Sequence, residues 1–271
     1  MRFRNAVVAC VVTVGLLLAA VPASAQASDK PLTWLLSVQV KPGKMMDLKN
    51  AAEKYDKPVL DKLVAQGVIS SWGLACQMIG PPTESCFYYV TAADWAAMGK
   101  LDKAFSDDRK AMKESERKAM LDTVMSATEP DKETSSIVRH VVFHAVPGGD
   151  VKYLMRHIYT FKPGKGDEVV KLYKEYIAPT YEKLLSDGVI LGYGLAEPEM
   201  QSGAGWTHTS WIVFSDMAKL DEVEKAFDGA MKARGSELNE MLDATFMKAT
   251  VPGTHVDSLA EVLIHGGKTS K

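Results

Sequence analysis

The residue types that can transfer protons or hold an aromatic ligand gather in the second half of the chain. Residues 155–161 read Met-Arg-His-Ile-Tyr-Thr-Phe, and an extended strand places His157, Tyr159 and Phe161 of this segment on one face. His208 and Trp211 follow in a second segment of strand type. Because an imidazole exchanges protons near neutral pH, we predict that His157 and His208 are catalytic. The predicted ligand-binding residues are Tyr159, Phe161, Trp211 and His144.

A plainer interpretation of this set is that His157 and His208 are ordinary, partly exposed strand residues. The positions that match the first strand in the other half of the chain are apolar, namely Leu36, Val38 and Val40. A pocket in one half and apolar packing in the other would explain this difference. Alternation alone leaves the inner face of the strand open, since the other set is Arg156, Ile158 and Thr160.

Two more histidines, His140 and His144, alternate with apolar Val141 and Phe143 and are predicted to share the face opposite the helices. They would lie ~13 Å apart along the strand, too far to bind one metal ion whose bonds span ~2 Å. His144 and His265 match between the halves, which favours a shared role at the strand end over two catalytic bases. The chain has no paired-cysteine site, nucleophile elbow or dinucleotide fingerprint. We predict no metal and no cofactor.

The elements that must position these residues occur twice. Lys-Pro-Gly-Lys at 41–44 returns at 162–165, so Pro42 and Pro163 are 121 residues apart (163 − 42 = 121). Gly73-Leu74-Ala75 returns with the same offset as Gly194-Leu195-Ala196. Within the first copy, apolar periodicity predicts strand, helix, two strands, helix and strand over 34–41, 45–66, 68–78, 86–91, 94–127 and 137–146. Pro58 and Pro179 lie inside the first helix of each copy and predict a kink or break there.

The order β-α-β-β-α-β predicts a ferredoxin-like α+β unit, an antiparallel sheet with both helices on one face. Two such units in one chain can cover each other's open sheet face. We therefore predict a single-chain, pseudo-dimeric α+β barrel. Its first repeat spans 31–146, its linker 147–152 and its second repeat 153–266.

These motifs resemble a known family. A strand that ends in Lys-Pro-Gly-Lys, then a helix, then a Gly-Val turn and a Gly-Tyr-Gly-like strand is similar to NIPSNAP-like and related dimeric α+β-barrel proteins. Both copies carry the pattern, so the resemblance covers most of residues 33–265. It implies the fold. The superfamily includes cofactor-free monooxygenases, haem-handling proteins and degradation enzymes, so the resemblance does not choose a function.

The beginning of the chain has the pattern of a cleavable secretory signal over residues 1–25, with Arg2 and Arg4, an apolar run and Ala23-Ser24-Ala25. We therefore expect a periplasmic or secreted protein. Cys76 and Cys86 flank Pro81-Pro82 in a predicted hairpin and are expected to form a disulfide. The alternative is a redox pair, although the spacing is not Cys-x-x-Cys.

The formal charge of −2 becomes about −4 without Arg2 and Arg4, and charges of both signs are scattered along the chain. This distribution gives no reason to expect nucleic acid or, after signal cleavage, a membrane as a partner. A monomer or a homodimer fits equally well.

Three functions follow from these predictions. The first is an exported barrel that binds a small molecule. The second is a cofactor-independent monooxygenase or isomerase that uses a barrel histidine as a base. The third is a non-catalytic interaction or assembly module, which a fully packed interior would favour.

Overall fold

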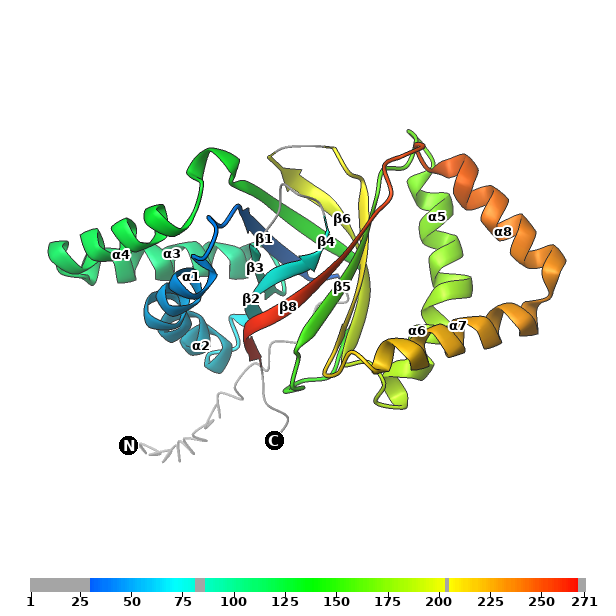
Figure 1. Cartoon of the computed structure of the whole chain (residues 1–271), viewed down its shortest axis with the longest axis horizontal. Coiled ribbons are helices and arrows are strands. Elements are labelled where there is room, and N and C mark those ends of the chain that lie inside the picture. Colours follow the sequence, from blue (N-terminus) through cyan, green and yellow to red (C-terminus); the bar gives the residue numbers. More distant parts are fainter. Residues whose placement is uncertain (1–29, 81–85, 203–204, 268–271) are drawn as a thin grey trace, which may run out of the picture.

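The computed structural model describes residues 30–80, 86–202 and 205–267. Eight antiparallel strands close into a barrel in the order β1-β3-β2-β8-β5-β7-β6-β4 (Figure 1). The predicted secretory signal at 1–25 lies outside the described residues. Within the described ranges, no helix combines the length and apolarity needed to cross a bilayer.

Apart from the short η2 helix of the first half, both halves of the chain have the same order of elements. The first half contains β1 (Leu32–Val38), α1 (Met45–Ala51), the π-helix η1 (Ala52–Asp56), α2 (Lys57–Ala65), β2 (Ile69–Ile79), β3 (Cys86–Ala92), α3 (Trp95–Ala111), α4 (Glu114–Ala127), η2 (Pro130–Lys132) and β4 (Thr134–Ala145). The second half contains β5 (Tyr153–Tyr159), α5 (Gly166–Leu172), the π-helix η3 (Tyr173–Ile177), α6 (Ala178–Ser186), β6 (Gly192–Gln201), β7 (His208–Phe214), α7 (Lys219–Arg234), α8 (Ser236–Ala249) and β8 (Val256–Gly267).

The first helix of each half is interrupted where the sequence predicts it. Pro58 and Pro179 stand at the start of α2 and α6, each directly after a π-helical turn. A proline nitrogen carries no hydrogen to donate to the preceding turn, and a π turn accommodates the missing bond. The second helix differs from the prediction, because 94–127 is two helices. Met112 and Lys113 adopt extended backbone angles between α3 and α4.

The barrel separates two kinds of core. The outer faces of the sheets pack against helices, and these lie on opposite sides of the barrel for the two halves (Figure 1). One outer core surrounds Trp72 and Leu74, and the other surrounds Tyr193 and Ile212. Along each strand, side chains alternate between the outer face and the interior of the barrel. Those that point inward include Phe87, which belongs to a small inner cluster with Ala75, Leu154 and Ala260.

Irregular pairing changes which histidines share a face. A register shift between His140 and Val142 places His140 inside the barrel and leaves His144 outside, 3.7 Å from Glu182 of α6. The prediction that His140 and His144 share a face is therefore wrong, because the extra residue at Val141 reverses the alternation.

The predicted match between His144 and His265 is also wrong. Leu32 pairs with Arg139 in the first half, and Tyr153 pairs with Glu261 in the second, so β4 and β8 match at an offset of 122 (261 − 139 = 122). His265 therefore matches Phe143, and His144 matches Gly266. His144 stacks on Tyr193, where Gly266 leaves room for the Trp72 indole.

Cys76 and Cys86 form the predicted disulfide across β2 and β3, where their Cα atoms are 4.0 Å apart. Both cysteines are buried in the outer core of the first half. A disulfide stabilises a protein in part by restricting the unfolded chain, and a loop of this length corresponds to about 3 kcal/mol. We expect the C76A/C86A double variant to lose about that much free energy of unfolding in urea titrations. Equal loss from wild-type protein treated with a reductant is the control, and unchanged stability in both would contradict this role.

Candidate functional site

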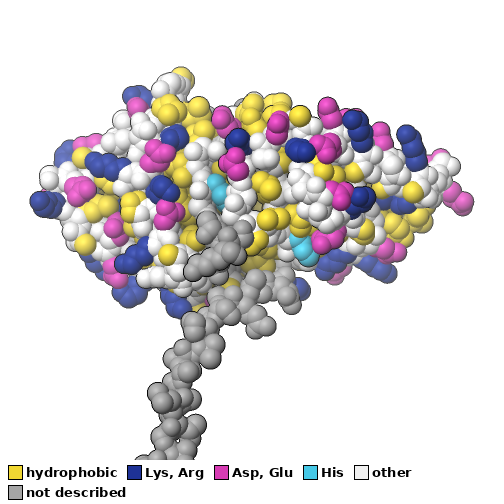
Figure 2. All heavy atoms as spheres, turned by 90° about the horizontal axis from the view of Figure 1, so that it is seen from below, with side chains coloured by type: hydrophobic (Ala, Val, Ile, Leu, Met, Phe, Trp, Pro, Cys, Tyr) yellow, Lys and Arg dark blue, Asp and Glu magenta, His cyan; other side chains and the backbone are white. Residues whose placement is uncertain are grey.

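A cavity of about 300 Å³ lies inside the barrel, which is at the lower end of the size range of small-molecule sites. Its lining is mostly apolar and extends to the barrel end formed by Pro31, Ser70, Pro147 and Gly267. Figure 2 looks onto this end and shows hydrophobic side chains in the middle part of the molecule. The polar side chains of the lining include Thr33, Tyr89, Thr91, His140, Arg156, Thr209 and His265.

His140 is a neutral hydrogen-bonding group at the cavity wall. Its Nε2 lies 2.8 Å from Thr33 Oγ1, and Thr33 Oγ1 lies 2.9 Å from Thr91 Oγ1. The Trp211 indole donates to His140 Nδ1 at 3.4 Å, which assigns the imidazole proton to Nε2. Burial lowers the pKa of His140 to about 3. The imidazole is therefore a poor base at neutral pH and serves to fix Thr33 and Trp211.

A second pair, Tyr89 of β3 and His265 of β8, also lines the cavity. Tyr89 Oη lies 2.9 Å from His265 Nδ1. Burial raises the pKa of Tyr89 and lowers that of His265, so both groups are neutral near pH 7. The phenol therefore donates and the imidazole accepts. Tyr89 and His265 therefore add a hydrogen-bonding pair without net charge to the cavity wall.

Thr209 supplies the one buried side-chain oxygen or nitrogen that lacks a hydrogen-bond partner within the described part of the chain. It lines the cavity and is only 4% exposed. An unsatisfied buried hydroxyl costs about 1–3 kcal/mol. A polar group on a bound molecule would give Thr209 Oγ1 the missing partner.

Four of the six predicted site residues lie together on the other face of the sheet, beneath α5 and α8. Tyr159 and Phe161 stack with ring centroids 5.5 Å apart. The His157 ring lies 6.4 Å from Tyr159, and the His208 ring lies 4.8 Å from Phe161. Phe246 of α8 packs edge-on against both Tyr159 and Phe161.

His208 is a buried member of this outer group. Its Nε2 lies 3.2 Å from Glu197 Oε1, and its Nδ1 lies 3.0 Å from Thr207 Oγ1. Burial lowers the pKa of His208, and the Glu197 carboxylate opposes that shift. Burial also raises the pKa of Tyr159 to about 12. At neutral pH this face therefore carries a neutral imidazole beside a carboxylate, next to a protonated phenol.

The remaining two predicted residues are elsewhere. Trp211 lines the inner cavity, and His144 stacks on Tyr193 with ring centroids 5.0 Å apart. Of the alternate set in 154–161, Arg156 faces the cavity, with its guanidinium 4.4 Å from the Phe87 ring. The site predicted as one group is thus divided between the two faces of the barrel wall. The predicted site did not include Thr33, Tyr89 or Thr209. The signal that could have found them is that they are polar residues in the inward-facing set of alternating positions on their strands.

A larger cavity of about 570 Å³ lies between the sheet and the helices of the first half. Most of its lining is apolar. Its charged centre is Asp56, which accepts hydrogen bonds from Arg109 Nη2 at 2.8 Å and Tyr88 Oη at 3.3 Å. Burial raises the pKa of Asp56, and the Arg109 charge offsets part of that shift. The hydrogen bonds among Asp56, Arg109 and Tyr88 pair the charge of Asp56 with that of Arg109. A structural role is enough to account for this cluster.

Comparisons with known proteins bear on the fold. No family model matches the chain, and no curated protein matches it. A candidate monooxygenase from Fusobacterium nucleatum is similar in structure, with a TM-score of 0.59 and 14% identity over 89% of this chain and 96% of that one. A second, from Lactobacillus acidophilus NCFM, has a TM-score of 0.60 and 9% identity over 89% and 98%.

An anthrone oxidase-like protein has a TM-score of 0.50 and 11% identity over 89% of this chain and 94% of that one. At such identities the likenesses bear on the fold alone, and they do not single out NIPSNAP-like proteins. Together with the closed antiparallel barrel, they show that this chain shares the fold of these proteins, an α+β barrel.

Proposed function

We propose that this protein binds a small molecule with an apolar, aromatic body inside the barrel. One observation carries the proposal: the buried Thr209 hydroxyl lacks a partner among the described residues and lies at the wall of the 300 Å³ cavity. An apolar lining with a few fixed polar groups is typical of small-molecule sites. The indole of Trp211 offers an aromatic surface beside it. The cavity also counts against a non-catalytic interaction or assembly module, which a fully packed interior would favour.

The test uses two ligands that differ by one hydroxyl, 2-naphthol and naphthalene, with Thr209→Val as the variant. Valine keeps the shape of threonine and removes the hydroxyl. We expect the variant to bind 2-naphthol about fivefold more weakly, since a hydrogen bond contributes about 1 kcal/mol, and to bind naphthalene unchanged. Isothermal titration calorimetry measures binding.

The same variant has an expected effect on stability. Thr209→Val should raise the free energy of unfolding by about 1 kcal/mol, because an unsatisfied hydroxyl is removed. Thr33→Val is the matched control, and it should lower stability by about 2 kcal/mol because Thr91 and His140 lose their partner. Failure of both naphthalene and 2-naphthol to bind the wild-type protein would refute the proposed ligand class.

A second candidate function is oxidation of an electron-rich aromatic compound by O₂ without a cofactor. The neutral His208 beside Glu197, on an aromatic surface, favours it, and so do the names of the structural neighbours. In such a reaction His208 takes a proton from an activated methylene. One oxygen atom of O₂ becomes the oxygen of a carbonyl group at the former methylene carbon. The second oxygen atom leaves as water, together with the two hydrogen atoms of the methylene.

Oxygen consumption with an anthrone-type substrate separates the two functions. An enzyme has a pH-dependent rate that His157→Ala or His208→Ala abolishes. A binding protein shows no turnover in any of the three proteins. Loss of rate in His208→Ala alone would assign the base to His208.

The finer description of the fold is also our inference. Matched contacts support a duplicated ferredoxin-like unit: Trp72 donates to Asp61, and Tyr193 donates to Glu182 at the corresponding positions. The disulfide and the sequence of residues 1–25 support export to the periplasm or the exterior. We propose a monomer or homodimer whose partner is the small molecule.

A further inference from the structure

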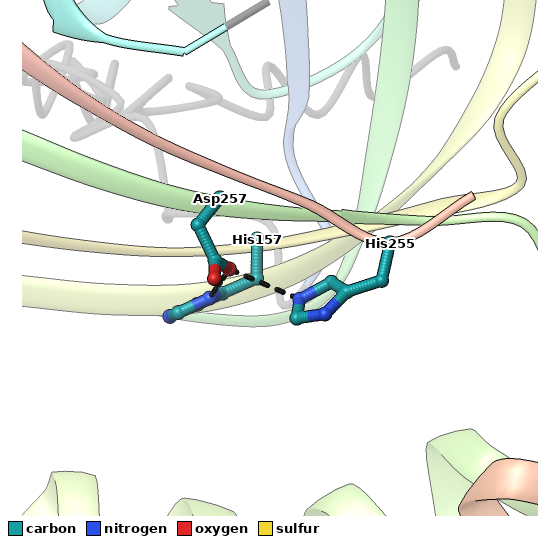
Figure 3. A group of neighbouring side chains, drawn as sticks. All are labelled: His157, His255 and Asp257. Carbon is teal, nitrogen blue, oxygen red and sulfur yellow. Dashed lines mark hydrogen bonds and ion pairs between the residues drawn. The ribbon is translucent and has the colours of Figure 1, made fainter. Parts of the chain in front are cut away.

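Three ligand-type side chains meet at the β5–β8 seam, on the outer face of the barrel. His157 of β5 pairs with Asp257 of β8, and directly opposite residues of antiparallel strands project to the same side. His255 precedes Asp257 by two residues, so the extended chain directs it to the same side. Figure 3 shows the three side chains turned toward one another, below the sheet and toward the helices.

The three groups share one carboxylate oxygen. His157 Nδ1 lies 2.5 Å from Asp257 Oδ1, and His255 Nε2 lies 3.0 Å from the same atom. One nitrogen or oxygen of each residue lies within 4.8 Å of the others. Ligands around a tetrahedral zinc ion, with bonds of 2.0–2.2 Å, are roughly 3.4 Å apart. Small side-chain rotations therefore bring the three donors to bonding distance of one ion.

We propose that His157, His255 and Asp257 bind a divalent transition-metal ion of the zinc type. Two imidazoles and one carboxylate are a ligand set for such ions, and three protein ligands leave positions for water. The side chains of His255 and Asp257 are 45% and 60% exposed, so an ion reaches them from solvent. The set does not suit Mg²⁺ or Ca²⁺, which prefer oxygen ligands.

Aromatic packing holds the imidazoles in place. The His255 ring stacks on Tyr159 with centroids 4.8 Å apart and planes 5° from parallel. The His157 ring lies on the other side of the set, 6.1 Å from His255. Fixed rings lose little rotamer freedom when an ion binds, which favours affinity.

The first half of the chain shows that the fold does not require these residues. Its equivalent strand pair places Leu36 opposite Ser135, and Glu133 stands where the second half has His255. The same barrel wall forms with none of the three ligands. The barrel wall therefore does not need His157, His255 and Asp257 in order to form. Binding of an ion would account for the three residues lying together in one half only.

The site is independent of the inner cavity. Arg156, which lines that cavity, points to the opposite face of β5 from His157. Variants of the metal ligands therefore leave naphthol binding unchanged, and Thr209→Val leaves metal binding unchanged. Each proposal can fail without the other.

The experiment titrates Zn²⁺ into chelator-treated, tag-free protein by calorimetry, and records the absorption spectrum of bound Co²⁺. The variants transfer the residues of the first half, His157→Leu and Asp257→Ser, so that each keeps a side chain the fold already accepts. His255→Ala removes the third ligand. His144→Ala is the control, because His144 and Glu182 form an exposed histidine–carboxylate pair that has no third ligand among the described residues.

We expect one Zn²⁺ to bind per chain, and a thousandfold excess of Mg²⁺ should not displace it. Bound Co²⁺ should show the visible absorption bands of an ion with four or five ligands. Each of the three ligand variants should weaken Zn²⁺ binding at least a hundredfold while keeping the far-ultraviolet circular dichroism of the wild type. His144→Ala should bind as tightly as wild type. The proposal fails if wild-type protein takes up no Zn²⁺ or Co²⁺, or if His157→Leu and Asp257→Ser bind as wild type does.

Discussion

Acid should destabilise this protein through His140 by about 3 kcal/mol at pH 4. Burial lowers the pKa of His140 from 6.5 to about 3. The unfolded chain therefore takes up a proton at His140 as the pH falls below 6.5, and the folded protein takes it up only near pH 3. Since the unfolded state binds more protons in this window, stability falls with falling pH. Each pH unit costs about 1.4 kcal/mol.

The variant that isolates this effect is His140→Gln. Glutamine can still donate to Thr33 and accept from Trp211, but it does not titrate. We expect the variant to be less stable than wild type at pH 7, and we expect the difference to shrink and reverse as the pH approaches 4. His208 and His265, whose pKa values are also lowered by burial, titrate in both proteins and cancel in the difference.

Urea titrations of both proteins at pH 7, 6, 5 and 4 measure the effect. The free-energy difference should change by about 1.4 kcal/mol per pH unit below 6.5. Parallel curves would mean that water reaches His140 through the barrel end and that the imidazole protonates in the folded state.

The elements could be predicted from the sequence because each depends on local signals. The Lys-Pro-Gly-Lys turns, the apolar periodicity and the prolines at 58 and 179 act over a few residues. The break between α3 and α4 was not predictable in this way, since Met112 and Lys113 are ordinary helix residues that adopt extended angles. Tertiary packing decides such a position.

The arrangement of the candidate sites could not be predicted, because it depends on features that alternation does not contain. One extra residue at Val141 reverses the faces of His140 and His144. The meeting of His157 with Asp257 depends on the pairing register of strands that are 100 residues apart in sequence. The inner cavity depends on Thr209 and Trp211 facing into the barrel. The sequence alone does not decide whether this set of alternating residues or the other set of the strand faces inward.

Two glycines that repeat in the sequence have a physical reason inside the barrel. A Cβ atom on Gly73 would lie 2.4 Å from the Tyr89 ring and 2.7 Å from the carbonyl oxygen of Ile264. A Cβ atom on Gly194 would lie 2.7 Å from the Trp211 ring. Each glycine therefore admits the inward-facing aromatic ring of the neighbouring strand.

Gly73→Ala should lower the free energy of unfolding by about 3 kcal/mol, the upper part of the range for overpacked cores. The Tyr89 ring can turn, but the Ile264 carbonyl belongs to the β2–β8 seam that joins the two halves and cannot withdraw without breaking strand pairing. Gly194→Ala should cost less, about 1 kcal/mol, because the nearest atoms all belong to the Trp211 side chain, which borders the open cavity.

Gly99→Ala is the control for the loss of a glycine as such. Gly99 lies within α3, and its added Cβ atom would meet nothing within 4 Å. Alanine there should stabilise the protein by up to about 1 kcal/mol, because glycine is the poorer helix former. Thermal and urea unfolding of the three variants should give the order Gly99→Ala, Gly194→Ala, Gly73→Ala from most to least stable. An equal cost at Gly73 and Gly194 would show that the seam yields as readily as a side chain, and that the two halves are less firmly joined than their strand pairing implies.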